Sequence, residues 1–302
     1  MSEDVELREL ATIRDWLRHA VSRFTEAQLC FGHGSDNAFD EAAYLILAGL
    51  ALPLDRLEPF LDARLLPEER VRLQELLRRR VDERLPAAYL TGEAWLGEYR
   101  FRVDRRVIVP RSFIAELLDS GLSPWLAPDR GIGRILDLCT GSGCLAILAA
   151  LSFPDAQVDA VDLSAEALEV ARDNVADYAL EDRIRLIRSD LFESLPRGCY
   201  DLILSNPPYV SASSMATLPA EYRHEPGMAL SGGLDGLDIV RRLLAEAGPW
   251  LEPDGLMCVE IGANRDAFER AFPELAVTWV ATASSDDQVF VIGREALLGF
   301  VR

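Results

Sequence analysis

The tetrapeptide Asn206-Pro207-Pro208-Tyr209 carries the residue types that a reaction at a planar nitrogen needs. The lone pair of an amide or a conjugated amine is delocalised, so a site that uses such a nitrogen as a nucleophile must hold it in a fixed orientation. The side-chain oxygen of Asn206 and the carbonyl of Pro207 can accept its two N–H bonds, and Tyr209 can pack against the flat group. Asn-Pro-Pro is also a good turn sequence, but its position after the apolar run 201–204 favours a reactive site.

Three carboxylates that end apolar segments indicate a bound cofactor. Asp137 precedes the glycine loop 139–143, and these glycines permit a tight turn and a close approach of a ligand to the backbone. Asp137 suits an ammonium group, Asp162 can accept two ribose hydroxyls, and Asp190 beside Leu191 can contact an adenine amino group and ring. The set fits S-adenosylmethionine.

Other functions use parts of the same pattern. The loop also matches the dinucleotide motif G-x-G-x-x-A, but we find no histidine or tyrosine-lysine arrangement that would serve a nicotinamide enzyme. An adenine-amine methyltransferase acting on nucleic acid could use the same Asn-Pro-Pro-Tyr chemistry, but it would need a basic groove. A cofactor-sensing module without catalysis is the third alternative, and the intact tetrapeptide argues against it.

The periodicity of the apolar residues divides the chain into two parts. Helical spacing dominates to about residue 84, and Pro67 opens a helix whose arginines at 78, 79, 80 and 84 we interpret as dipole compensation and solvation. A period of two between residues 95 and 109 predicts a hairpin that turns near residues 104–106. A helix over about 112–126 follows.

Seven strands are then expected, at 134–138, 157–161, 184–187, 201–204, 256–261, 276–280 and 288–292. The last two should be antiparallel, in an otherwise mostly parallel α/β sheet of the Rossmann-like class I methyltransferase type.

Composition narrows the partners and the compartment. The chain has 50 acidic and 31 basic residues, a net charge of −19, which disfavours non-specific nucleic-acid binding and favours a basic protein partner. Five scattered cysteines and three histidines lack the spacing of a metal site, so no metal is expected. The acidic start and the absence of a long apolar run predict a cytoplasmic protein without a membrane segment.

The motifs together resemble the protein glutamine N5-methyltransferases over essentially the whole chain. The similarity includes Ala88-Tyr89-Leu90-Thr91-Gly92, Val109-Pro110-Arg111, the glycine loop, the Asn-Pro-Pro-Tyr motif, Glu225-Pro226 and Gly232-Gly233-Leu234-Asp235-Gly236. The release-factor branch usually follows Pro-Arg with Pro-Glu-Thr-Glu. This chain has Ser112-Phe113-Ile114-Ala115 there and Phe31-Gly32-His33-Gly34-Ser35-Asp36-Asn37 earlier, which resembles the branch that modifies large-subunit ribosomal protein L-three.

The resemblance implies roles for named residues. Asn206, Pro207 and Tyr209 would be catalytic and, with Pro208, would hold the glutamine amide. The implied cofactor set is Asp137, Thr140, Gly141, Ser142, Gly143, Asp162, Leu163, Asp190, Leu191 and Asn206. Cys139 stands where many relatives carry glycine. His33 or Glu225 could contact substrate, although packing and loop fixing are the favoured roles for them.

The resemblance also implies a division of labour along the chain. Residues 1–94 would form a helical substrate-recognition domain, 95–110 a hairpin linker and 111–302 the methyltransferase domain. The expected substrate is a glutamine of ribosomal protein L-three, with release factors and nucleic-acid adenine as alternatives.

Overall fold

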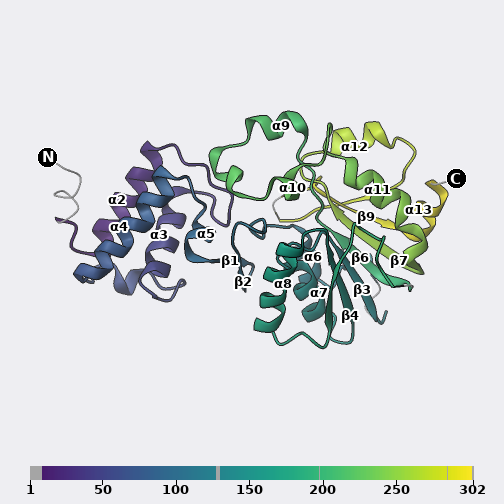
Figure 1. Cartoon of the computed structure of the whole chain (residues 1–302), viewed down its shortest axis with the longest axis horizontal. Coiled ribbons are helices and arrows are strands. Elements are labelled where there is room, and N and C mark those ends of the chain that lie inside the picture. The colour runs from purple at the N-terminus through teal and green to yellow at the C-terminus, as the bar shows by residue number, and fades with distance from the viewer. Residues whose placement is uncertain (1–8, 127–129, 197, 284, 301–302) are drawn as a thin grey trace. The chain divides into compact units, whose positions relative to one another are not determined.

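The chain forms two compact units. The computed structural model describes residues 9–126, 130–196, 198–283 and 285–300, and the acidic start at residues 1–4 lies outside these ranges. One unit, the helical unit, contains residues 1–94 together with 219–224. The other, the sheet unit, contains residues 95–218 and 225–302 (Figure 1). The chain therefore leaves the sheet unit for six residues after residue 218 and then returns to it.

The helical unit is built from short amphipathic helices. Their bounds are α2 (Ile13–Glu26), α3 (Ala38–Gly49), η2 (Glu58–Phe60), α4 (Pro67–Asp82), α5 (Ala87–Thr91) and η3 (Ala220–His224). Thr12 begins α2 with a capping box, in which its side chain accepts from the backbone of Asp15 and Asp15 accepts from the backbone of Thr12. Trp16, Ala20 and Phe24 repeat at helical spacing and are buried in the core of the unit.

The arginines at and just after the end of α4 do not share one environment, so the interpretation of all four as solvated is wrong for Arg80, whereas the side chain of Arg84 is partly exposed. Arg80 is 0% exposed, and its guanidinium donates to Glu41 at 2.6 Å and to the carbonyl of Cys30 at 3.0 Å. Arg84 donates to the carbonyl of Ala27 at 2.6 Å. Both donors meet acceptors that lie far away in the sequence, which helical periodicity alone does not reveal.

The predicted hairpin is present, but its turn lies earlier than expected. Strands β1 (Glu93–Leu96) and β2 (Tyr99–Arg102) pair with each other and are joined at Gly97-Glu98, not at residues 104–106. Gly97 has φ 61°, a left-handed conformation that suits the turn. Asp104 instead accepts from the backbone N–H of Arg106 in a local turn that pairs no strands.

A seven-stranded sheet forms the centre of the sheet unit. Its strands are β3 (Arg134–Leu138), β4 (Gln157–Asp162), β5 (Ile184–Arg188), β6 (Tyr200–Ser205), β7 (Leu251–Glu260), β8 (Thr278–Val280) and β9 (Val289–Gly293), in the order β5-β4-β3-β6-β7-β9-β8. Neighbouring strands from β5 through β4, β3 and β6 to β7 pair in parallel. β9 is antiparallel to both of its neighbours, β7 and β8. The seven predicted strands and the antiparallel final pair are confirmed.

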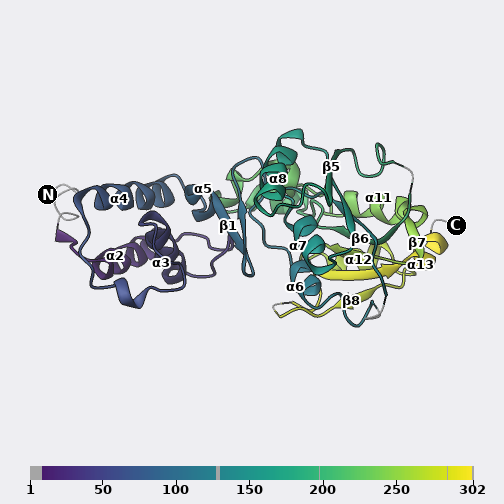
Figure 2. The same cartoon turned by 90° about the horizontal axis from the view of Figure 1, so that it is seen from below.

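Helices cover both faces of this sheet (Figures 1 and 2). The helices of the sheet unit, not all of which lie on the sheet, are α6 (Ile114–Asp119), α7 (Cys144–Ser152), α8 (Ala165–Asp177), α9 (Ala212–Thr217), α10 (Gly227–Leu230), α11 (Asp238–Glu246), η4 (Gly248–Trp250), α12 (Arg265–Ala271) and α13 (Arg294–Phe300). Alternate strand residues enter separate cores. Ile135 packs with α6 and α7, whereas Leu136 packs with α11 and α12. This period of two on a sheet buried on both faces is the arrangement expected of an α/β fold.

The predicted helix over residues 112–126 is shorter in the structure. α6 covers only residues 114–119, and the backbone then turns through Gly121 and Leu122, whose φ angles are 61° and 55°. Left-handed residues end a helix, and Gly121 adopts this conformation without the steric cost that a side chain imposes.

Candidate active site

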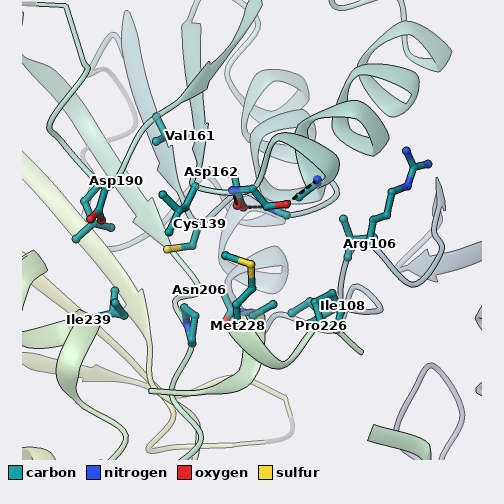
Figure 3. A pocket seen from close by; sticks show the side chains of 18 of the residues that line it. Arg106, Ile108, Cys139, Val161, Asp162, Asp190, Asn206, Pro226, Met228 and Ile239 are labelled. Carbon is teal, nitrogen blue, oxygen red and sulfur yellow. Dashed lines mark hydrogen bonds between the residues drawn. The ribbon is translucent and has the colours of Figure 1, made fainter. Parts of the chain in front are cut away.

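A pocket opens at the carboxyl ends of the parallel strands (Figure 3), with an empty volume of about 850 Å³ including its mouth. The carboxyl edge of such a sheet is where α/β proteins bind ligands. Seven of the predicted site residues line it: Gly141, Asp162, Leu163, Asp190, Leu191, Asn206 and Pro208. The remaining predicted residues, Asp137, Thr140, Ser142, Gly143, Pro207 and Tyr209, do not border this pocket.

The glycine loop between β3 and α7 is held by its neighbours. Gly141 has φ 54°, and its N–H donates to Asp162 at 2.8 Å. Gly143 has φ 80°, and a Cβ there would lie 3.2 Å from the Cβ of Ala171. Cys139 adopts φ 62°, so the non-glycine residue at this position takes the left-handed conformation and presents its side chain to the pocket.

Asn174 of α8 connects the glycine loop to the hairpin. Its side-chain N–H groups donate to the carbonyls of Ser142 at 2.8 Å and Arg102 at 3.1 Å, and its oxygen accepts from the Arg102 N–H at 2.7 Å. Asn174 is fully buried, and its amide acts as a bridge between the glycine loop and the end of β2. Sequence reasoning did not single out this residue.

Asp137 supports the loop from behind. Its carboxyl group is fully buried and accepts a hydrogen bond from the Thr140 hydroxyl at 2.5 Å. Burial, the largest cause, raises the pKa of Asp137 to about 7. Its other oxygen, Oδ1, is buried and has no hydrogen-bond partner within the described residues, so the carboxyl group keeps an acceptor for the ammonium group that the sequence predicts.

Asp162 and Asp190 both reach the pocket, but they differ in their partners. Asp162 accepts from the backbone N–H groups of Gly141 and Ser164, and burial raises its pKa. These two bonds orient the carboxylate at the pocket wall and leave lone pairs for a ligand. Asp190 is held by a side chain instead: its carboxylate accepts from the Arg242 guanidinium at 2.7 Å.

Asn206 follows β6 directly and faces the same space as Asp162 (Figure 3). The preceding residue, Ser205, donates from its hydroxyl to the carbonyl of Leu138 at 2.9 Å, so the ends of β6 and β3 are joined. Within the described ranges, no hydrogen bond from another residue occupies the side-chain amide of Asn206. Its oxygen is therefore available to accept from a bound group.

The chain after Asn206 is packed tightly against the Gly232–Gly236 segment. Val210 donates to the carbonyl of Leu230 at 2.8 Å, and Gly232 donates to the carbonyl of Val210 at 2.9 Å. A Cβ on Gly232 would lie 2.7 Å from Tyr209 Cα, and a Cβ on Gly236 would lie 2.4 Å from the Tyr209 carbonyl oxygen. These glycines are needed because the backbones approach too closely for a side chain.

Tyr209 is anchored by the carboxyl end of β7. Its hydroxyl donates to Glu260 at 3.1 Å, and Glu260 also accepts from the Ser112 hydroxyl at 2.6 Å and the Phe113 N–H at 2.9 Å. Asn264 donates to the Tyr209 carbonyl at 2.7 Å. The position of this tyrosine is thus set by residues far from it in sequence.

Several pocket residues were not predicted. Arg106, Ile108, Pro226, Met228 and Ile239 line it, and they come from three separate segments (Figure 3). Pro226 belongs to the Glu225-Pro226 motif, and this motif is the feature of the sequence that could have identified its part of the pocket wall. Ile108, Met228 and Ile239 are apolar residues that a single sequence does not mark, and the guanidinium of Arg106 is paired with Asp104 and Glu169.

The structure also assigns roles to the two residues proposed as possible substrate contacts. Glu225 accepts from the Val109 N–H at 2.9 Å and from Arg111 at 2.5 and 2.8 Å, which makes it a loop-fixing residue. His33 is buried, with its ring 4.3 Å from the ring of Tyr222, so it packs within the helical unit.

Other classes of site receive no support from the described part of the chain. It contains no group of three His, Cys, Asp or Glu side chains arranged to hold a metal ion. The five cysteines are free thiols. Every helix in the described ranges is too short or too polar to span a membrane.

Comparison with known proteins defines the class first. A family described as the methyltransferase small domain matches residues 115–221. The catalytic domain of hMettl16, solved in complex with MAT2A 3′UTR hairpin 6, shares the fold with a TM-score of 0.50 at 14% identity, over 76% of this chain and 83% of that one. With its seven-stranded, mostly parallel sheet, the protein is a class I methyltransferase with a Rossmann-like fold.

Curated relatives then define the family. The ribosomal protein uL3 glutamine methyltransferase of Bordetella pertussis is 62% identical over 96% of this chain and 97% of its own length. The enzyme of the same name from Neisseria meningitidis serogroup A is 60% identical over 97% and 96%, and that of Bradyrhizobium diazoefficiens is 49% identical over 94% and 91%. The chain belongs to the family of ribosomal protein uL3 glutamine methyltransferases, which confirms the predicted branch.

Proposed function

We propose that this enzyme transfers a methyl group from S-adenosylmethionine to the side-chain nitrogen, N5, of a glutamine in ribosomal protein uL3. The observation that carries the proposal is the 62% identity over nearly the full length of an enzyme of that name. The position of Asn206 on the pocket supports it, because the chemistry requires an acceptor beside the cofactor.

The pocket fits the proposed cofactor. Asp162 presents an oriented carboxylate for two ribose hydroxyls, and the Gly141 turn lets a ligand approach the backbone. Asp190, Leu191 and Leu163 would surround the adenine. Thr140, Ser142 and Gly143 would shape the loop, and Oδ1 of Asp137, whose other oxygen is held by Thr140, would accept from the ammonium group of the cofactor. S-Adenosylmethionine supplies an electrophilic methyl group on a sulfonium sulfur.

The protein's own contribution is orientation of the nucleophile. The Asn206 side-chain oxygen and the Pro207 carbonyl would accept the two N–H bonds of the glutamine amide, and Tyr209 with Pro208 would contact its flat face. Holding the amide in this way directs the nitrogen lone pair toward the methyl carbon. No strong base is required, since the nitrogen loses its proton after the new N–C bond forms and its acidity has risen.

Two other acceptors use the same chemistry. A release-factor glutamine is one, and the amino group of adenine in a nucleic acid is the other. The names of the curated relatives favour uL3 over release factors. The net charge of −19 weighs against a polyanionic substrate.

We assign substrate recognition to residues 1–94, with residues 95–110 as the linker and 111–302 as the methyltransferase domain. A basic ribosomal protein would be attracted to an acidic enzyme, which supports uL3 as the partner. A ribosomal-protein substrate also supports a cytoplasmic location.

A labelling experiment tests the proposal. Purified enzyme is incubated with radiolabelled S-adenosylmethionine and, in parallel reactions, uL3, release factors and duplex or single-stranded nucleic acid. We expect label in uL3, located at a glutamine by mass spectrometry. Label confined to release factors would overturn the substrate, and label in nucleic acid would overturn the acceptor class.

A further inference from the structure

Glu260, the last residue of β7, is a buried carboxylate that the proposed reaction does not use directly. Its exposed fraction is 1%, and it accepts three hydrogen bonds. Oε2 accepts from the Ser112 hydroxyl at 2.6 Å and from the Phe113 N–H at 2.9 Å, and Oε1 accepts from the Tyr209 hydroxyl at 3.1 Å. Removing a charged side chain from water is costly unless such bonds replace its hydration.

The pattern of donors suits a carboxylate. All three partners donate, and a carboxylate offers two acceptor oxygens with no N–H of its own. A glutamine could still accept from Ser112 and Phe113 through its oxygen, but it would present an NH₂ group to the Tyr209 hydroxyl, so the tyrosine would have to accept and the bond to a charged group would be lost. Burial raises the pKa of Glu260, and its three donors and the nearby Arg111 oppose that rise.

The ring of Tyr209 has a second restraint from the same segment. Gly262, two residues after Glu260, has φ 54°, and a Cβ at that position would lie 2.6 Å from Cε2 of the Tyr209 ring. The ring therefore lies against backbone while its hydroxyl is fixed by Glu260. Together with the bond from Asn264 to the Tyr209 carbonyl, the end of β7 restrains the ring, the hydroxyl and the main chain of this residue.

We propose that Glu260 is a positioning residue for methyl transfer: it fixes the orientation of the Tyr209 ring, and Ser112 fixes Glu260. The inference rests on the proposed contact between Tyr209 and the acceptor amide. In the proposed reaction, Glu260 contacts neither the acceptor amide nor the cofactor. It acts through Tyr209, and its loss would leave that ring free to rotate away from the orientation that places the amide nitrogen.

A kinetic double-mutant cycle tests this coupling. Tyr209→Phe and Glu260→Gln are each expected to lower kcat about tenfold, the effect of losing one hydrogen bond to a charged group. The double variant should be no slower than the slower single variant, because both changes remove the same interaction. The KM for S-adenosylmethionine should stay within about twofold of the wild-type value, since neither residue lines the cofactor pocket. Ser112→Ala should lower kcat in the same direction, and Ser112→Thr, which keeps the hydroxyl, should restore most of it.

The sheet unit offers a matched control. The hydroxyl of Tyr200 donates to Asp159 at 2.8 Å, which is also a buried tyrosine–carboxylate bond, but it lies at the amino-terminal end of β6. Tyr200→Phe should leave kcat near the wild-type value. Multiplicative losses in the double variant, or a Tyr200→Phe loss equal to that of Tyr209→Phe, would overturn the inference.

The outcome is separable from the proposed function. The cycle is run on whichever acceptor the wild-type enzyme labels, so a negative result with uL3 counts against the proposed substrate alone. If Glu260→Gln does not fold, the cycle is completed with Ser112→Ala and Tyr209→Phe, with cofactor binding by calorimetry as the check on folding. Additive effects there would equally overturn the positioning role.

Discussion

Asn206 is the residue on which the proposed chemistry depends most directly. It sits at the pocket end of β6, where the bond from Ser205 to the Leu138 carbonyl joins two strands of the sheet. The side chain thus extends from a rigid element, and little conformational entropy is lost when it accepts a substrate N–H.

We predict that Asn206→Ala lowers kcat by about 100-fold or more, the usual effect of removing a preorganised hydrogen-bonding group or misplacing a substrate. The dissociation constant of S-adenosylmethionine, measured by calorimetry, should change by less than about fivefold, because Gly141, Asp162 and Asp190 remain. A variant with wild-type turnover would remove Asn206 from the mechanism.

The raised pKa of Asp137 predicts how the stability of the protein depends on pH. The unfolded chain gives up this proton near the ordinary pKa of an aspartate, 3.8, whereas burial raises the pKa in the folded protein to about 7. Between these pH values the folded state binds more protons, so its stability falls as the pH rises. Above pH 7 the full cost, on the order of a few kcal/mol, is present.

We therefore expect the free energy of unfolding to fall more between about pH 4.5 and pH 8 in the wild type than in Asp137→Asn, by roughly 2 to 4 kcal/mol. Urea unfolding at each pH measures the difference. The exposed variant Asp155→Asn serves as the control and should follow the wild type. Parallel curves for Asp137→Asn and the wild type would contradict the raised pKa.

The limits of sequence reasoning are clear at the residue scale. Asp162, Asp190 and Asn206 could be predicted because each ends a strand that its own local sequence identifies. Glu260 and Asn174 could not, since Glu260 is one polar residue in an apolar segment and Asn174 is one of several polar residues on its helix, and the importance of each comes from partners that only the fold brings near.

At the scale of elements, too, some features could be predicted from the sequence and others could not. The parallel strands could be predicted because burial on both faces produces continuous apolar runs, and the final pair because no helix fits between them. The hairpin turn was misplaced because residues 99–103 alternate perfectly whether they form the first or the second strand. The left-handed Gly97 decides between the two, and a conformation of that kind is not visible in the alternation.

Arg80 shows how one element can depend on another that is distant in sequence. Its guanidinium bonds to Glu41 of α3 and lies 3.5 Å from Glu221 of η3, and all three side chains are at most 2% exposed. Glu221 also accepts from the Cys30 N–H at 3.0 Å. The segment 219–224 is thereby held within the helical unit by a buried ionic cluster.

We predict that Arg80→Met lowers the free energy of unfolding by about 3 to 5 kcal/mol, because it leaves the buried carboxylate of Glu41 without its cation and leaves Glu221 with Arg84 alone. The matched control is Arg78→Met on the same helix. Arg78 is 46% exposed and pairs with Glu75 and Glu83 at the surface, so its loss should cost at most about 1 kcal/mol. Urea unfolding of the two variants compares them, and equal losses would contradict the assignment of Arg80 as the core of the cluster.

At the scale of the whole molecule, charge is the property that bears on partner choice. The net charge of −19 is spread over a chain in which many arginines are already paired with carboxylates. The excess acid therefore sets the long-range field, which attracts a basic protein and repels a polyanion. Such attraction accelerates encounter more than it strengthens the bound contacts.

The last prediction follows from that field. We expect the KM for full-length uL3 to rise about tenfold as ionic strength increases from about 0.05 to 0.5 M, because the Debye length shrinks from over 10 Å to less than 5 Å. A short uncharged peptide that contains the target glutamine should show a KM independent of salt, and kcat should change little for either substrate. This pair of substrates separates electrostatic capture from chemistry at the pocket. Equal salt dependence for the two would mean that the acidity of the chain serves its solubility and takes no part in recognising its substrate.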